Sequence, residues 1–115
     1  MPLITKLPSS AEAPWEPVAP EKIVSGAPQT RTTVLYENAA ERLYAGEWEA
    51  TVGAWRIAYG EWEYIRVLTG RCIIRGDDGS SIEAGPGESF VIEPGFTGIW
   101  EVLEPMHKLW VIREA

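Results

Sequence analysis

Hydrophobic and β-branched residues occur along most of this chain in short runs that glycine, aspartate and proline interrupt. The interruptions recur roughly every ten residues, a pattern typical of an antiparallel β-sandwich or β-barrel. The predicted strands are Thr32–Tyr36, Leu43–Thr51, Ala54–Tyr59, Glu63–Thr69, Arg71–Arg75, Ser81–Ala84, Ser89–Ile92, Gly98–Leu103 and His107–Arg113. No window holds a sustained helical period with capping residues, so Asn38–Arg42 is at most one helical turn or a loop.

The predicted breaks between these strands consist of residues that favour turns. The segment Asp77-Asp78-Gly79 predicts a hairpin, because aspartate and glycine tolerate positive φ. Gly70 is predicted to form another turn with positive φ, and Pro94-Gly95 a corner between two strands. Glu104-Pro105 predicts a further break, since proline cannot donate to a strand ladder.

Residues 1–30 differ from the rest, because they contain six of the nine prolines. We expect an irregular or extended Pro-rich N-terminal arm with a short strand around Lys22–Ser25, followed by one β-domain over residues 31–115. The arm also carries the apolar residues Leu3, Ile4, Leu7 and Trp15. These residues indicate that the arm lies against a surface, and that surface can belong to a second subunit.

Composition limits the classes of partner. The chain has 115 residues, 45% of them hydrophobic, and a net charge of −7, which indicates one packed acidic domain. Nucleic acids and anionic membranes need clustered positive charge, so neither is expected as a partner. No apolar run approaches the length of a bilayer span, and the first residues lack the apolar stretch of a signal peptide. A single cysteine, Cys72, fits a reducing cytoplasm.

Several common site chemistries are poorly represented in the sequence. Cys72 and His107 are its only cysteine and histidine, too few for an ordinary zinc site. Ser89 lies in a segment that resembles a nucleophile elbow, but Val91 occupies the place where that motif needs glycine. The glycines near residue 85 lack the third glycine and the helix of a dinucleotide-binding loop.

Two glycine-anchored blocks resemble the sequence motifs of the cupin superfamily. The first block runs from Glu63 through Gly70 to Ile74, with a glutamate seven positions before a glycine. The second runs from Gly85 through Pro94-Gly95 to Trp100. Together with the segments Gly46–Trp55 and Val102–Val111, they are similar to the cupin-3 subfamily, which includes (S)-ureidoglycine aminohydrolase-like domains. The resemblance covers about residues 31–113 and implies a single-domain, all-β cupin-type β-barrel (a double-stranded β-helix, or jelly roll).

The same resemblance predicts that the usual metal site is missing. Metal-binding cupins carry a His-x-His motif before the glutamate and another histidine after the Pro-Gly corner. Here residues 56–62 contain no histidine, and the later position falls on Gly98. Only Glu63 of the four usual ligands remains, so we expect neither a metal nor another cofactor.

Strand alternation then selects the residues that face the barrel interior. If Glu63 points inward, as the family glutamate does, Ile65 and Val67 follow it, and Trp100 shares a face with Gly98. On the last strand two phases remain open, one with Met106, Lys108 and Trp110 inward and one with His107, Leu109 and Val111 inward. The resemblance favours Lys108. The candidate ligand-binding residues are Trp48, Tyr59, Glu63, Trp100 and Lys108.

These residues are compatible with three functions, and the sequence leaves open whether the protein is an enzyme. An aromatic cavity with a charge pair suits the binding of a small polar metabolite. An enzyme similar to (S)-ureidoglycine aminohydrolase, or another cupin lyase or isomerase, would use Glu63 as the catalytic acid or base and Lys108 to stabilise negative charge. A homodimeric structural or interaction module is the third function, and its barrel would be filled by its own side chains.

Overall fold

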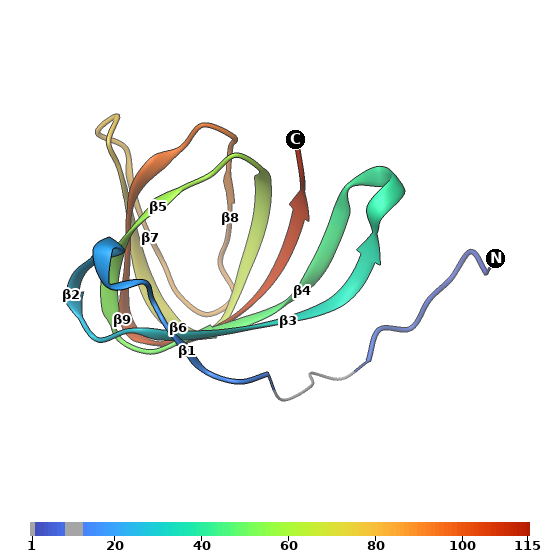
Figure 1. Cartoon of the computed structure of the whole chain (residues 1–115), viewed down its shortest axis with the longest axis horizontal. Helices are drawn as coiled ribbons and strands as arrows, with labels where there is room; N and C mark the ends of the chain where they lie inside the picture. The colour runs from blue at the N-terminus through green and yellow to red at the C-terminus, as the bar shows by residue number, and fades with distance from the viewer. Residues whose placement is uncertain (1, 9–12) are drawn as a thin grey trace.

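The computed structural model describes residues 2–8 and 13–115, and within them it forms a single curled antiparallel sheet of nine strands (Figure 1). The strands are β1 (Glu16–Pro17), β2 (Ile23–Gly26), β3 (Gln29–Asn38), β4 (Leu43–Ala50), β5 (Gly53–Ala58), β6 (Trp62–Gly76), β7 (Ser81–Ala84), β8 (Ser89–Ile92) and β9 (Thr97–Arg113). The helices are two single 3-10 turns, η1 (Pro20–Lys22) and η2 (Ala39–Glu41), and among the described residues no helix could cross a membrane. The all-β prediction is confirmed.

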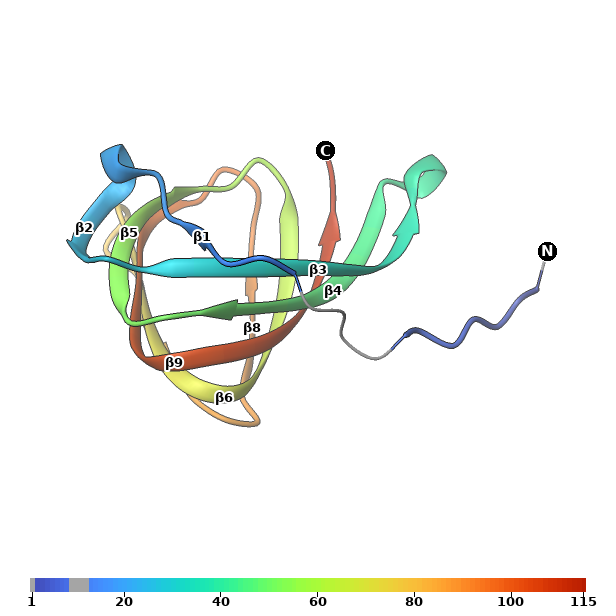
Figure 2. The same ribbon diagram turned by 60° about the horizontal axis from the view of Figure 1, so that its bottom comes forward.

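Strand β9 organises the sheet because it pairs along both of its edges. One edge pairs with β6 over almost the whole length of both strands. The other edge pairs with β5 in its first half and with β4 in its second half. The strand order β1-β3-β4-β9-β5-β2 therefore curls around an interior, with β7 and β8 on the far edge of β6 (Figures 1 and 2).

The prediction of a break at Gly70 was wrong, since Glu63–Thr69 and Arg71–Arg75 belong to one strand, β6. Gly70 does have the expected positive φ, +87°. Instead of a turn, it produces a bulge, and the register with β9 shifts on both sides of it. An extra unpaired residue bends a strand without ending it, and this bend lets β6 follow the curved sheet.

The predicted break at Glu104-Pro105 is also absent, because β9 runs continuously from Thr97 to Arg113. The pairing of β9 explains why proline is tolerated. Pro105 lies between the residues that pair with β5 and those that pair with β4, and it faces the bulge of β6. No ladder bond requires its missing N–H at this point.

The N-terminal segment joins the sheet from Glu16 onward. The short strand expected near Lys22–Ser25 is β2, which pairs with β5, while β1 pairs with the start of β3. Residues 2–8 extend away from the barrel (Figures 1 and 2), and residues 1 and 9–12 of the predicted arm lie outside the described residues. Trp15 packs on the sheet surface, where its ring lies 4.6 Å from the Arg31 guanidinium carbon.

The predicted turn chemistry at the other glycines is confirmed. The Asp77-Asp78-Gly79 hairpin joins β6 to β7, with Gly79 at a φ of +90° and its N–H 3.1 Å from the Gly76 carbonyl oxygen. Pro94-Gly95 forms the corner between β8 and β9, where Gly95 has a φ of +94°. The segment Asn38–Arg42 contains the short η2 turn, capped by the Asn38 side chain.

The interior of the curled sheet is packed with large side chains from alternate positions. Ile65, Val67 and Cys72 of β6 are fully buried. Trp100 and Val102 of β9 are at most 2% exposed. This alternation confirms that Glu63, Ile65 and Val67 share the inward face. Packing of this face against β4 and β5 stabilises the curl, because each buried side chain removes apolar surface from water.

Gly70→Ala tests the bulge. An added Cβ would collide with the Pro105 carbonyl oxygen, and alanine would also be strained at positive φ. We expect a loss of about 3 kcal/mol in the free energy of unfolding, measured by urea denaturation. Gly79→Ala is the matched control, because that glycine has positive φ in open space, and its loss should be only about 1 kcal/mol. Equal losses for the two variants would refute a steric role for the bulge.

Candidate functional site

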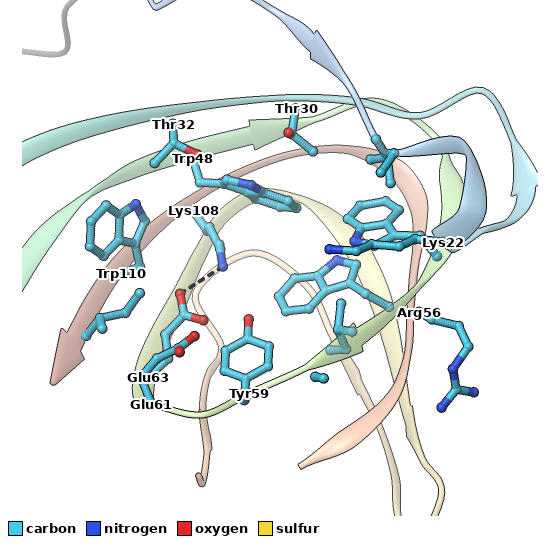
Figure 3. Close-up of a pocket in the computed structure, with 17 residues that line it drawn as sticks. Lys22, Thr30, Thr32, Trp48, Arg56, Tyr59, Glu61, Glu63, Lys108 and Trp110 are labelled. Atoms are coloured by element: carbon cyan, nitrogen blue, oxygen red, sulfur yellow. Dashed lines mark hydrogen bonds and ion pairs between the residues drawn. The ribbon is translucent and has the colours of Figure 1, made fainter. Parts of the chain in front are cut away.

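A pocket of about 440 Å³ opens on the interior face of the curled sheet. Five of its lining residues are aromatic, and its polar groups come from different elements of the chain (Figure 3). The lining residues are Val18, Ala19, Lys22, Thr30, Thr32, Trp48, Trp55, Arg56, Ile57, Ala58, Tyr59, Glu61, Glu63, Trp100, Lys108, Trp110 and Ile112. All five residues predicted to form the site, Trp48, Tyr59, Glu63, Trp100 and Lys108, are among them.

The inward phase of β9 is the one that contains Lys108. Met106, Lys108 and Trp110 are buried, whereas Leu109 is 37% exposed on the outer face. The register places Lys108 between Trp48 of β4 and Val67 of β6. The Lys108 ammonium group therefore enters the pocket from the central strand β9, between β4 and β6.

Glu63 and Lys108 form a buried ion pair. Lys108 Nζ lies 3.1 Å from Glu63 Oε2, and each side chain is only 5% exposed (Figure 3). Burial lowers the pKa of the Lys108 ammonium, and the neighbouring Glu63 carboxylate opposes this effect. Buried ion pairs contribute little net stability, because desolvation of both charges offsets their attraction.

Two tryptophans enclose the same ammonium group. Lys108 Nζ lies 4.5 Å from the centroid of the Trp48 ring and 4.6 Å from that of Trp100. The two rings pack edge to face, with centroids 5.4 Å apart. A cation over aromatic faces is stabilised by the ring quadrupoles, so this arrangement favours positive charge on the nitrogen.

Tyr59 adds a hydroxyl beside the carboxylate. Its phenol points toward Glu63 in the close-up view (Figure 3). Burial raises the pKa of Tyr59 far above its ordinary value, and the Glu63 carboxylate and a hydrogen bond to it raise it further. The phenol therefore keeps its proton and can donate it to Glu63 in a hydrogen bond.

Trp55 and Trp110 also line the pocket, although neither was among the predicted site residues. Trp55 and Ile57 share the inward face of β5, and Tyr59 follows directly after this strand in the same alternation, so strand alternation applied to Tyr59 would have found Trp55. The indole N–H groups of Trp100 and Trp110 are buried, and no hydrogen-bond partner for them occurs among the described residues. Both nitrogen atoms have almost no accessible surface, so neither N–H group presents a donor to the pocket space.

The rim residues Val18, Ala19 and Lys22 come from the N-terminal segment, which has no strand periodicity that could have placed them. Arg56 also contributes to the pocket, but its guanidinium points away (Figure 3) and binds Asp77 at 2.6 Å. The charged groups at the rim of the pocket are the ammonium group of Lys22 and the carboxylate of Glu61. The Glu63–Lys108 pair lies deeper, in the interior of the pocket.

Two other reactive side chains lie outside the pocket. His107 faces away from the interior, where its Nε2 lies 3.7 Å from Glu47 Oε2. Cys72 is completely buried, and burial raises the pKa of its thiol to about 11, so it packs as a small apolar residue. Neither residue belongs to the lining of the pocket.

The donor set in this pocket does not fit a metal ion. Glu63 is committed to Lys108, whose positive charge lies close to the carboxylate oxygens. At Gly98 a side chain could not be accommodated, because an added Cβ would collide with the Arg75 carbonyl oxygen. Among residues 2–8 and 13–115, no group of three histidine, cysteine, aspartate or glutamate side chains is arranged to hold a metal.

Comparison with known structures identifies the fold. A protein of unknown function from the DUF861 family of Pseudomonas syringae pv. tomato matches with a TM-score of 0.79 and 23% identity, covering 89% of this chain and 44% of its own. The Clostridium difficile EutQ protein matches with a TM-score of 0.68 and 22% identity, covering 76% of this chain and 70% of its own. This chain therefore spans less than half of the Pseudomonas protein.

A third structure is similar over almost its whole length. The putative ethanolamine utilization protein Q of Salmonella typhimurium has a TM-score of 0.66 and 15% identity, covering 93% of this chain and 99% of its own. Likeness at these identities establishes the fold, and it confirms the predicted cupin-type jelly roll. The resemblance to (S)-ureidoglycine aminohydrolase domains stays a prediction.

The family follows from the sequence match. None of the curated proteins compared with this chain matches it. The family model described as the EutQ-like cupin domain, cupin-3, matches residues 37–110, which include all five predicted site residues. The chain therefore belongs to the cupin-3 family of EutQ-like cupin domains.

Proposed function

We propose that this protein binds a small polar metabolite in the barrel pocket through the buried Glu63–Lys108 pair, without a metal ion. The observation that carries the proposal is the enclosure of this pair, 5% exposed on each side, in the wall of a pocket of about 440 Å³. That volume lies within the range of small-molecule sites. A barrel filled by its own side chains would leave no such space.

The walls and polar groups favour a flat ligand with an acceptor atom. Trp48 and Trp55 lie with ring centroids 6.2 Å apart and offer apolar faces on which a planar group can stack. The Lys108 ammonium group has three N–H donors and gives one of them to Glu63, so it can supply a donor for a carbonyl or carboxylate oxygen.

The buried ion pair gives a second argument for binding. Such a pair is a weak stabiliser compared with apolar side chains of similar volume, so fold stability alone does not explain it. Lys108 and Glu63 also approach each other from different strands, β9 and β6, at a point where the pocket is lined by aromatic rings. Charged groups held in this way orient a polar ligand within an apolar cavity.

A stability cycle distinguishes a functional pair from a structural one. Lys108→Met and Glu63→Leu should each lower the free energy of unfolding by about 3–5 kcal/mol, because each leaves one buried charge without its partner. The double variant should recover to within about 1 kcal/mol of wild type in urea denaturation. A double variant several kcal/mol less stable than wild type would instead show that the fold needs the pair, and would support the filled, structural barrel.

Ligand binding is tested by thermal shift with a panel of ureides, amino acids, sugars and small carboxylates. A bound compound at a hundred times its Kd should stabilise the protein by about 2.7 kcal/mol. Tyr59→Phe removes only the hydroxyl beside Glu63 and should weaken binding by about tenfold. Tyr64→Phe is the matched control, since that hydroxyl binds Ser89 on the exposed face at 2.9 Å. Absence of any shift across the panel would count against the pocket.

We also infer that the chain forms a homodimer through its N-terminal arm. Leu3 and Ile4 are 103% and 87% exposed on a segment that extends from the barrel (Figure 1). The outer sheet face carries the exposed apolar residues Val91 and Leu109, at 44% and 37%. The apolar arm of one copy can therefore pack on the apolar outer sheet face of the other copy.

Deletion of residues 1–8 tests the arm, because the sheet itself begins only at Glu16. Light scattering coupled to size-exclusion chromatography should give a dimer for the full chain and a monomer for the truncated one. The melting temperature at low concentration should change little, since none of the described residues 2–8 belongs to the hydrophobic core or packs against it. A truncated protein that stays dimeric would exclude the arm as the dimer contact.

A further inference from the structure

We propose that Lys108 is a nucleophile that forms a Schiff base with a small aldehyde or ketone in the barrel pocket. The inference rests on the proposed ligand binding, and it names the chemical class of the ligand as a carbonyl compound. It assigns Glu63 as the acid and base of the same reaction. The proposal stands on the position of the Lys108 amine relative to the pocket, the carboxylate and the two indole faces.

Lys108 differs from the other lysines of the chain in its surroundings. The sequence contains three lysines, and Lys6 and Lys22 are exposed. Lys108 is 4% exposed and lines the pocket. An amine that must attack a carbonyl group needs an unprotonated nitrogen. Burial of Lys108 favours this neutral form, whereas the Glu63 carboxylate and the indole faces favour the ammonium until the proton is transferred.

The Glu63 carboxylate is positioned to take the proton. Its Oε2 lies 3.1 Å from Lys108 Nζ, within hydrogen-bond distance. Transfer of the proton along this bond converts two buried charges into a neutral amine and a neutral acid. Burial also favours the neutral amine, because it lowers the pKa of Lys108. Tyr59 lies beside Glu63 and acts as a positioning residue for the carboxyl group.

The reaction balances with these two groups alone. The neutral Lys108 amine adds to the carbonyl carbon, so that a C–N bond forms, and Glu63 passes a proton to the former carbonyl oxygen. The nitrogen of the resulting carbinolamine then gives one proton to Glu63. Glu63 passes this proton to the hydroxyl group, which leaves as water. The products are a protonated imine on Lys108, one water molecule and the Glu63 carboxylate.

The enclosure that surrounds Lys108 suits the product better than the neutral amine. A protonated imine is a cation, and it would keep the Trp48 and Trp100 faces that now lie 4.5 Å and 4.6 Å from the nitrogen. Glu63 would again be its counterion. The same contacts therefore stabilise the charge that develops as water leaves.

Reductive trapping tests the assignment. The full chain is incubated with propanal or with pyruvate in the presence of sodium cyanoborohydride, and the alkylated lysine is located by peptide mass spectrometry. We expect one adduct at Lys108 that forms at least about tenfold faster than adducts at Lys6 or Lys22. The exposed lysines serve as internal references within the same molecule.

Three variants define the roles. Lys108→Arg keeps the positive charge but removes the amine, so the fast adduct should disappear. Glu63→Gln keeps the size of the side chain but cannot accept a proton, so the rate should fall by roughly 10²-fold. Lys6→Arg is the control outside the pocket, and it should leave the rate at Lys108 unchanged.

The outcomes separate this inference from the proposed binding function. Labelling of Lys108 in wild type at or below the rate of Lys22 would overturn the Schiff-base assignment, whatever the stability of the variants. If compounds without a carbonyl group still raise the melting temperature in that case, binding stands and only the covalent step falls. If neither labelling nor stabilisation occurs, both proposals fall.

Discussion

The pairing of β6 with β9 is the constraint from which the rest of the structure follows. These two strands are the longest in the protein and pair along almost their whole lengths. A flat ladder of this length could not enclose anything, so both strands must bend together. The bulge at Gly70 and the unpaired position of Pro105 face each other across the ladder and allow that bend. The curled face then becomes an interior.

The same ladder brings the charged groups of the pocket together. Glu63 and Lys108 are 45 residues apart in sequence, yet they project from adjacent strands on one face. Tryptophans from β4 and β9 exclude water around them. In this low-dielectric setting burial opposes the charge on Lys108, while the Glu63 carboxylate and the indole faces favour it. A charged pair is thus held among the aromatic residues of the cavity.

The histidine positions of metal-binding cupins show how the fold can be kept while the site changes. At Gly98 the backbone of β6 approaches so closely that no side chain fits. Lys108 lies against the one carboxylate that remains, Glu63, and supplies a positive charge beside it. The two substitutions are physically consistent, because a lysine supplies positive charge without needing a set of ligands.

Strand alternation was sufficient to predict several site residues. The resemblance placed Glu63 and position 98 inward, and the period of two then gave Ile65 and Val67 on one strand and Trp100 on the other without any knowledge of contacts. The same rule could not choose between Lys108 and His107, because the expected break at Glu104-Pro105 separated their strand from the one before it. The structure shows a continuous β9, and its register with β4 and β6 decides the phase.

By itself, the sequence determined the all-β class, the hairpin at Asp77–Gly79 and the inward set on β6, because these depend on local backbone preference and on alternation within one strand. The tertiary structure alone decided that Gly70 bends a strand instead of ending it, and that N-terminal residues complete the pocket rim. Both outcomes depend on pairing between distant segments. A residue's local preference permits several such pairings, and only the packed sheet selects one of them.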